Sequence, residues 1–174
     1  FSARHLLVGR VDGRFDSFEG RLTIVEDPEQ LFGPFEVTFA AASIDTRVEV
    51  RDDDLRSPRF FDAEAFPDLV LRGGVSRHAS DGRWSVESQL TIRGVTNPVP
   101  LEVTVRGVAV DARGRSKAAL AVSAAIQRVD FGLTAELLQE SGPQGTGRDV
   151  EIRADVEAFL LSEGGDEAST EAAS

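Results

Sequence analysis

The chain has 174 residues, of which 41% are hydrophobic, and a formal net charge of −11 at pH 7. This length fits about one domain. The composition excludes a disordered chain and a transmembrane helix. Because no basic stripe is present to neutralise phosphates, it also excludes a nucleic-acid-binding protein. With no Cys and only two His, thiolate catalysis and zinc–thiolate sites are impossible, and we expect neither a metal nor a cofactor.

The chain contains no Met, and residues 1–8 (FSARHLLV) have the pattern of the middle of a strand. We therefore treat the N-terminus as trimmed, which means that a signal peptide is not assessable. We expect a cytoplasmic rather than a periplasmic or secreted protein.

Alternation of apolar and polar residues predicts β-strands through most of the chain. In chain order the patterns cover residues 22–25, 37–41, 69–71, 84–92, 101–106, 117–126 and 149–157. Turn residues at 80–82 and 111–114 separate neighbouring strands, and Asn97-Pro98 is expected to break the chain between two others. Because no βαβ alternation is present, we predict an antiparallel, all-β sandwich or barrel. The alternation shows which residues share a face but not which face is inward.

Residues 47–67 interrupt the strand pattern, and a connection of about 20 residues inside a domain is usually functional. The acidic run 52–54 predicts a short helical turn, and three phenylalanines follow it. The phenylalanines either seal one end of the core or form a lid over a cavity, and both interpretations share one geometry. The predicted lid consists of Leu55, Phe60, Phe61 and Phe66.

Residues 162–174 contain no large apolar side chain and no base. Such a segment cannot bury enough surface to offset the conformational entropy that ordering would cost. We predict that residues 1–161 form the folded domain and that residues 162–174 form a disordered acidic tail.

Few side chains are arranged for catalysis. His78 lies in a turn pattern and is expected to be solvated, whereas His5 lies in the first strand, where a structural hydrogen bond is a commoner role than that of a base. The acidic run 52–54 is flanked by three arginines, Arg47, Arg51 and Arg56. We therefore expect ion pairs within this segment. No Gly-x-Ser-x-Gly motif is present, and we predict no catalytic residues.

Residues 90–99, with the sequence LTIRGVTNPV, resemble the signature of the YceI family of polyisoprenoid-binding, lipocalin-like proteins. Further segments match that family in the same order along the chain. These segments are residues 3–6, 11–20, 42–46, 51–52 with 55–57, 60–62 with Pro67, 128–132 and 149–152. The resemblance extends from Ala3 to about Phe159 and is more specific than any single motif.

The resemblance implies an extended, eight-stranded antiparallel barrel of lipocalin type with a short helical insertion at one end. It implies an apolar tunnel that binds and carries or stores an amphiphilic long-chain lipid, namely a polyisoprenoid, an isoprenoid quinone, or a fatty acyl chain or amide. A homodimer is a further implication. Two alternatives stay open: an enzyme that acts on an apolar substrate within the barrel using His5, and a structural or interaction barrel without a ligand.

The alternation of apolar and polar residues and this expected fold together predict the site residues. The predicted tunnel lining consists of Phe39, Ala41, Trp84, Val86, Leu90, Leu101, Val103, Leu120, Val122, Ile126 and Phe131. Because an isoprenoid chain carries no polar atoms, polar contacts are expected only at the mouth of the tunnel. For this role we select His5, with Arg51 as the second choice.

Overall fold

The computed structural model describes residues 1–5, 9–27, 30–79, 82–110, 112, 115–135 and 146–159. The predicted acidic tail, residues 162–174, lies outside these ranges. The strands are β1 (Ser2–His5), β2 (Gly9–Asp12), β3 (Arg14–Phe15), β4 (Phe18–Asp27), β5 (Gln30–Ala40), β6 (Ile44–Asp45), β7 (Asp68–His78), β8 (Arg83–Ile92), β9 (Val95–Pro98), β10 (Leu101–Val110), β11 (Ser116–Gln127) and β12 (Thr146–Phe159). The described helices are α1 (Glu49–Arg56) and the short 3-10 helices η1 (Ala41–Ser43) and η3 (Arg128–Phe131).

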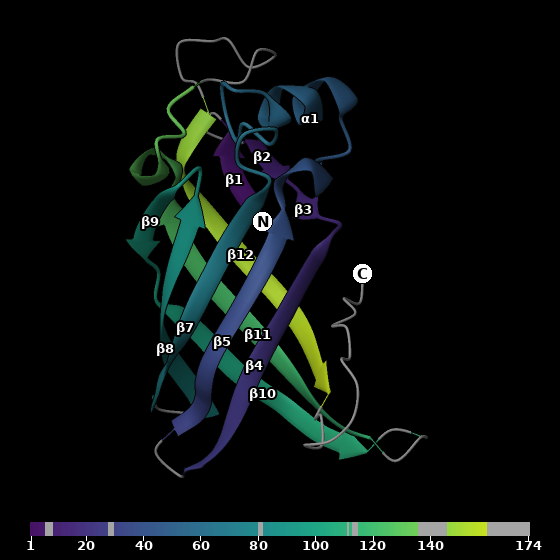
Figure 1. The fold of residues 1–174 in the computed structure, drawn as a ribbon, viewed down its shortest axis with the longest axis vertical. Coiled ribbons are helices and arrows are strands. Elements are labelled where there is room, and N and C mark those ends of the chain that lie inside the picture. The colour runs from purple at the N-terminus through teal and green to yellow at the C-terminus, as the bar shows by residue number, and fades with distance from the viewer. Residues whose placement is uncertain are drawn as a thin grey trace.

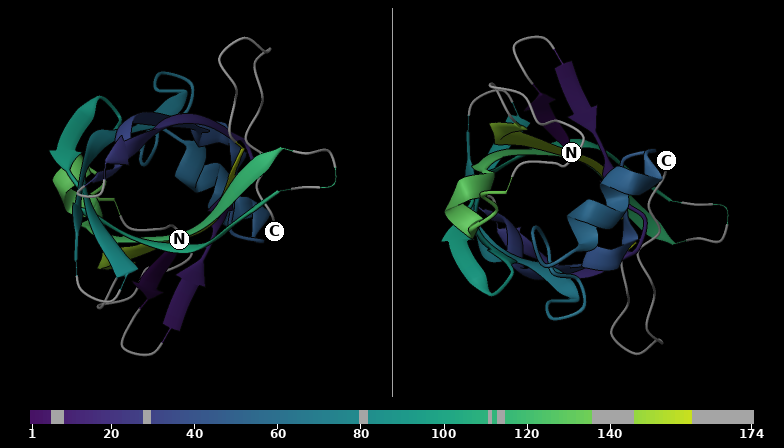
Figure 2. Two further views of the ribbon diagram at one scale, coloured as in Figure 1. Left: turned by 90° about the horizontal axis from the view of Figure 1, so that it is seen from below. Right: turned by 90° about the horizontal axis from the view of Figure 1, so that it is seen from above.

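Most strands belong to one strongly curled antiparallel sheet, which wraps into a half-barrel (Figure 1, Figure 2). Within the described residues its order is β2-β1-β12-β11-β10-β8-β7-β5-β4, and β9 pairs with β8 beside this path. The short strands β3 and β6 form a separate ribbon near α1 (Figure 1). The predicted all-β, lipocalin-like fold with a short helical insertion at one end is confirmed.

The inner face of the sheet carries the hydrophobic core. In β8 the side chains of Val86 and Leu90 are buried, and the residues on either side of each are mostly exposed. Residues directly opposite each other on paired strands share a face. Leu101 and Val103 of β10 lie opposite Val86 and Trp84, so these side chains also face inward. The burial pattern thus identifies the inward face, which the sequence pattern leaves open.

A β-bulge in β7 reverses the alternation of that strand. Between Gly73 and Val75 the pairing with β8 skips Gly74, which is the extra residue. Val75 is consequently 47% exposed on the outside, whereas Ser76 is 1% exposed on the inside. His78 shares the face of Ser76 and is the last residue of β7. The prediction that His78 lies in a turn is therefore wrong.

The bulge requires glycine because β5 and β8 approach it closely. A Cβ atom at Gly73 would lie 2.5 Å from the Phe35 ring and 2.6 Å from the carbonyl oxygen of Glu87. A Cβ atom at Gly74 would lie 3.0 Å from the Cα atom of Pro34. Glycine in a strand commonly marks such a site of close backbone approach.

Two predicted boundaries need correction. The strand that reaches Asn97 and Pro98 is β9, which ends at Pro98, and an additional turn at Arg93 and Gly94 separates it from β8. These two residues have φ angles of 50° and 73°, as a two-residue hairpin turn requires. Ala41 does not end the strand predicted over 37–41, because it begins η1.

We expect Gly73→Ala to lower the free energy of unfolding by about 1–3 kcal/mol, because the added methyl group overpacks the space against Phe35 and the β8 backbone. Urea unfolding followed by Trp84 fluorescence measures this change. The matched control is Gly107→Ala beside the bulge of β10, where a Cβ atom would meet nothing within 4 Å. We expect Gly107→Ala to lower the free energy of unfolding by less than about 0.5 kcal/mol. Equal losses in the two variants would contradict the steric role of Gly73.

Candidate functional site

The structure gathers the predicted tunnel lining into one place. Every residue of that set belongs to a single hydrophobic cluster or packs against it. The buried members are Ala41, Val86, Leu90, Leu101, Val103, Leu120 and Phe131. The half-buried members are Phe39, Trp84, Val122 and Ile126. Together they form the apolar interior of the half-barrel, while their contact with a ligand stays a prediction.

The two ends of the half-barrel differ. The capped end, uppermost in Figure 1, carries α1, η1 and η3. The open end is the one where β7 ends at His78, β8 begins at Arg83 and β10 ends at Val110. Seen from below, no described helix crosses the open end, and α1 lies behind the ring of strands (Figure 2).

Aromatic side chains close the capped end. The ring of Phe61 meets that of Phe15 edge to face, with 5.9 Å between the ring centroids. Phe15 also lies 6.0 Å from Phe39 of β5, measured between ring centroids. Such tilted and edge-to-face pairs add to the energy of apolar burial. The phenylalanines of the 47–67 connection thus continue the inner wall of the half-barrel.

The predicted lid residues are not equivalent. Phe60 is buried, with an exposed fraction of 3%, and Phe61 packs against the core cluster. Leu55 of α1 is half-buried. Phe66 is 36% exposed and lies against the turn between β8 and β9, where a Cβ atom on Gly94 would stand 3.4 Å from its ring. That these residues cover a ligand stays a prediction.

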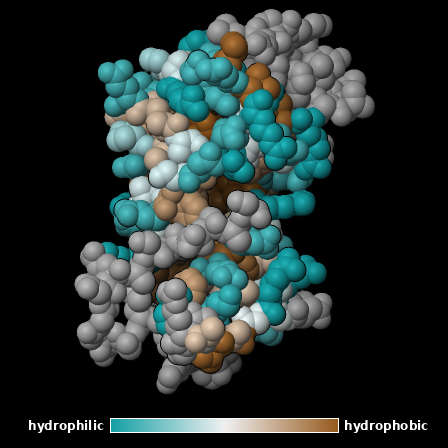
Figure 3. Space-filling model, turned by 90° about the vertical axis from the view of Figure 1, so that its right-hand side faces the viewer, coloured by the Kyte–Doolittle hydropathy of each residue, from teal (hydrophilic) through white to brown (hydrophobic). Residues whose placement is uncertain are grey.

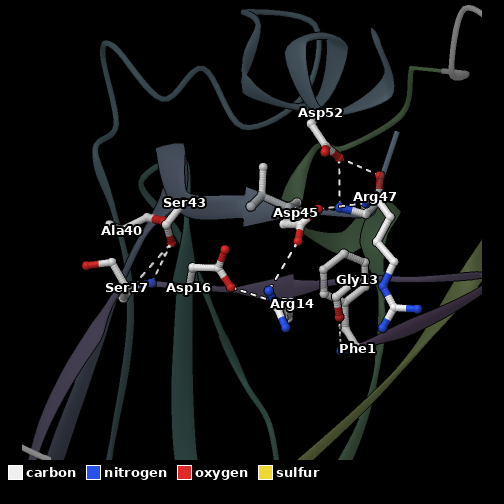
Figure 4. A network of polar contacts seen from close by, with 12 residues as sticks. Phe1, Gly13, Arg14, Asp16, Ser17, Ala40, Ser43, Asp45, Arg47 and Asp52 are labelled. Atoms are coloured by element: carbon white, nitrogen blue, oxygen red, sulfur yellow. Dashed lines mark hydrogen bonds and ion pairs between the residues drawn. The ribbon is translucent and has the colours of Figure 1, made fainter. Parts of the chain in front are cut away.

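Asp52 holds the start of α1 against the capped end. Its carboxylate accepts a hydrogen bond from the Thr46 backbone N–H at 2.9 Å and another from the Thr46 hydroxyl. Arg51 donates from Nε to the same hydroxyl at 2.8 Å and from Nη2 to the Thr46 carbonyl at 2.9 Å. Because Asp52 is only 5% exposed, these partners compensate for the loss of water around its charge. Figure 4 shows Asp52 beneath α1, above the β3–β6 ribbon.

Arginine side chains also hold the 47–67 connection, and for Arg56 the predicted ion pair is present. Arg56 donates to backbone carbonyls of η1 and of β6 at 2.9 and 2.8 Å. It also pairs with Asp53 at 3.1 Å. Arg59 pairs with the buried carboxylate of Asp54 at 2.8 Å. These contacts fix the backbone of the connection relative to the sheet.

Side chains also hold the short β3–β6 ribbon. Arg14 of β3 pairs with Asp16 at 2.6 Å and with Asp45 of β6 at 3.4 Å (Figure 4). The hydroxyl of Ser43 accepts a hydrogen bond from the Ser17 N–H at 3.0 Å. These contacts link β3 to β6 and tie the segment between β3 and β4 to η1.

The two residues selected for polar contact have different outcomes. His5 belongs to β1, but its side chain lies outside the described residues. Arg51 is half-buried and donates hydrogen bonds to Thr46. Its guanidinium therefore serves the start of α1 in this structure.

The open end exposes the inner face to solvent. Along β10, Val103 is buried, Val105 is half-buried, and Val108 and Val110 are exposed. Val108 lies opposite Ala118, which packs against the core cluster, so it continues the inner face. In Figure 3, which faces the side of β4 and β12, apolar residues are visible within a hollow and lower on the same face.

His78 and Trp84 lie at the rim of the open end, and the sequence interpretation missed their pairing. The two residues are opposite each other on β7 and β8. Their rings meet edge to face, with centroids 5.0 Å apart and planes at 82°. The consecutive glycines at 73–74 are the signal that could have revealed the pairing, because glycine inside a strand pattern suggests a bulge.

A separate groove of about 490 Å³ lies near the capped end, between β9, η3 and the neighbouring ends of β11 and β12. Its lining mixes polar residues, among them Arg10, Gln127 and Asp149, with apolar ones that include Ile126 and Phe131 of the predicted tunnel lining. Arg10 pairs with Glu151, another lining residue, at 3.0 Å. Gln127 and Asp149, which are exposed and lie opposite each other, line the outward side of the groove.

Charge on the outer face is partly paired across strands. Arg72 of β7 donates from Nε to Glu36 of β5 at 2.5 Å. This hydrogen bond, together with the positive charge, lowers the pKa of the Glu36 carboxyl group. The pair is exposed, so it carries little weight for stability.

The described residues offer few groups for other chemistry. Among them, no three His, Asp or Glu side chains are placed to hold a metal ion. The α-helix in the described part has eight residues, which is too short to cross a bilayer.

Comparisons of sequence place the chain beside known proteins. A family model described as the YceI-like domain matches residues 1–158. A UPF0312 protein of Staphylococcus aureus strain MSSA476 is 31% identical over 166 residues, which cover 94% of this chain and 92% of that protein. The corresponding protein of strain N315 is 30% identical over the same shares.

Comparisons of structure agree. The crystal structure of the YCEI protein of Campylobacter jejuni has a TM-score of 0.76 and 25% sequence identity, covering 93% of this chain and 92% of that one. BcnA of Burkholderia cenocepacia also has a TM-score of 0.76, at 18% identity, covering 90% of this chain and 92% of that one. The second likeness concerns the fold alone.

We expect Asp52→Ala to lower the free energy of unfolding by about 1–3 kcal/mol, because it leaves the buried donors of Thr46 without their acceptor. The matched control is the adjacent Asp53→Ala, since Asp53 makes an exposed ion pair with Arg56 and should contribute less than about 1 kcal/mol. Urea unfolding measures both variants. A loss in Asp53→Ala as large as that in Asp52→Ala would show that burial of the carboxylate is not the cause.

Proposed function

Since the chain belongs to the family of YceI-like domains, whose model matches residues 1–158, we propose that it binds and carries or stores an amphiphilic long-chain lipid inside the half-barrel. The proposed cargo is a polyisoprenoid or isoprenoid quinone, or a fatty acyl chain or amide. The observation that carries the proposal is the largely apolar inner wall, to which strands from β5 to β12 contribute members of one hydrophobic cluster and residues packed against it.

Burial of apolar surface is sufficient to drive such binding. Each buried CH2 group contributes roughly 0.8 kcal/mol, so a chain of about 15 carbons has a gross driving force on the order of 10 kcal/mol. Ordering of the chain and of the protein offsets part of this gain. Shape and apolar area are therefore enough to hold the cargo, and no reacting group is needed.

A binding role is favoured over catalysis by the polarity of the inner face. On β8 the inward Ser88 donates its hydroxyl proton to the Val99 carbonyl at 2.5 Å, so it is engaged in structure. An enzyme that uses His5 is the alternative, and loss of turnover in His5→Ala would support it.

A structural barrel without ligand is the third candidate. Homodimer formation is also proposed, and sedimentation of the purified protein tests it.

Native mass spectrometry of the purified protein, followed by organic extraction, tests the proposed function. We expect a mass increment that extracts as a prenyl or acyl compound. If the protein is purified empty, incubation with a ubiquinone and with hexadecanoic acid should produce the corresponding increments. An unchanged mass after both incubations would overturn the lipid-carrier proposal and favour the structural barrel.

We expect Phe61→Asp to weaken chain binding at least about a hundred-fold, which is about 2.7 kcal/mol, while lowering the free energy of unfolding by only about 1 kcal/mol, because a charge would replace an apolar contact at the closed end of the interior. The matched control is Phe66→Asp, since Phe66 lies outside against the β8–β9 turn. Titration of hexadecanoic acid, followed by Trp84 fluorescence, measures binding, and urea unfolding measures stability. Proportionate losses in binding and in stability would show that Phe61 is a core residue and not a lid.

A further inference from the structure

The polar groups of the two ends of the half-barrel differ in how they are used. At the capped end the buried carboxylate of Asp52 is bonded to Thr46, and Arg51 is bonded to the same residue. At the open end the inner face carries Ser76 and His78, which the bulge at Gly74 turns inward. The polar side chains of β7 that face the interior of the half-barrel, Ser76 and His78, therefore lie towards the open end.

His78 stands where the apolar interior meets solvent. Its imidazole ring contacts Trp84 edge to face at 5.0 Å, and Trp84 in turn packs against the hydrophobic cluster. His78 itself is exposed. A neutral imidazole offers one N–H donor and one acceptor. An aromatic surface with a polar neighbour at its edge suits a molecule that is apolar on one side and polar on the other.

The length of the wall suits a chain anchored at this point. β7 runs from Asp68 near the capped end to His78 at the open end. At about 3.3 Å per residue, its 11 residues span somewhat more than 30 Å. A long chain can thus extend along β7 and β8 towards Phe61 while its other end stays at the rim.

We propose that His78, supported by Trp84, is the head-group subsite of the lipid site. His78 donates a hydrogen bond to an oxygen atom of the cargo, such as that of a carboxylate, phosphate, hydroxyl or quinone carbonyl group. The chain then lies inward with its terminus towards the capped end. This inference rests on the proposed function, and it places the head group at the end opposite to His5, which pairs with the first residue of β12.

Two probes of equal chain length separate the head group from the chain. Hexadecanoic acid and hexadecane are titrated against the wild type and His78→Ala by displacement of the apolar dye N-phenyl-1-naphthylamine. We expect the affinity for the acid to fall about ten-fold, as the loss of one hydrogen bond to a charged group predicts. The affinity for hexadecane should change less than two-fold. His78→Gln, which keeps an N–H donor, should recover part of the affinity for the acid.

The matched control is Arg77→Ala, since the neighbouring Arg77 faces outward and pairs with Glu87 at 3.4 Å. This variant should bind both probes as the wild type does. Equal weakening of acid and hydrocarbon in His78→Ala would overturn the proposal, because His78 would then act by packing alone. Unchanged binding of both probes would overturn it as well. Failure of the wild type to bind either probe would instead reject the proposed function itself.

Discussion

The alternation of side chains along an antiparallel strand is the constraint on which this structure depends. A curled sheet buries one face, so every second residue must be apolar, and a single extra residue changes which set that is. β8 and β10 keep the alternation through their buried residues, whereas β7 departs from it at Gly74. The ring of Phe35 leaves no room for a side chain at Gly73, next to this departure. The polar positions of β7 on the inner face, Ser76 and His78, therefore follow from one extra residue in the strand.

The two ends of the sheet differ in which groups they bury: one end buries charged side chains, and the other exposes apolar ones. At the capped end, Asp52 and Asp54 are buried, and a buried carboxylate is tolerable only when hydrogen bonds and counter-charges replace its water. Those partners fix the geometry of the helical insertion. At the open end, Val108 and Val110 are exposed although they continue the inner face. The capped end is thus closed by aromatic side chains, and polar contacts hold the helical insertion in place above them. The open end stays accessible because Val108 and Val110 lack packing partners among the described residues.

The sequence predicts the sheet and its apolar wall well, because apolar and polar residues alternate clearly along half-buried strands such as residues 84–92. The predicted lining residues accordingly fall within one cluster. The sequence does not predict β3 and β6, since strands of two residues show no periodicity. It misses the turn before β9, because a positive φ at Arg93 is not signalled by residue type. The inward position of His78 is missed for a different reason: the residues after it predict a turn, whereas β7 continues through His78, and the bulge at Gly74 sets which face it takes.

The contrast between the two ends has a kinetic consequence. Native proteins open locally, and segments with few buried contacts open at much lower free energy than the whole molecule. The hydrogen bonds around Asp52 and Thr46 are far along the sheet from the strand ends at His78 and Val110. Fluctuations of those strand ends leave the bonds of the helical insertion intact. Under the proposed carrier function, the residence time of the lipid would follow the area that it buries and not the unfolding rate of its host, so a long-lived fold and a short-lived complex are compatible in one molecule.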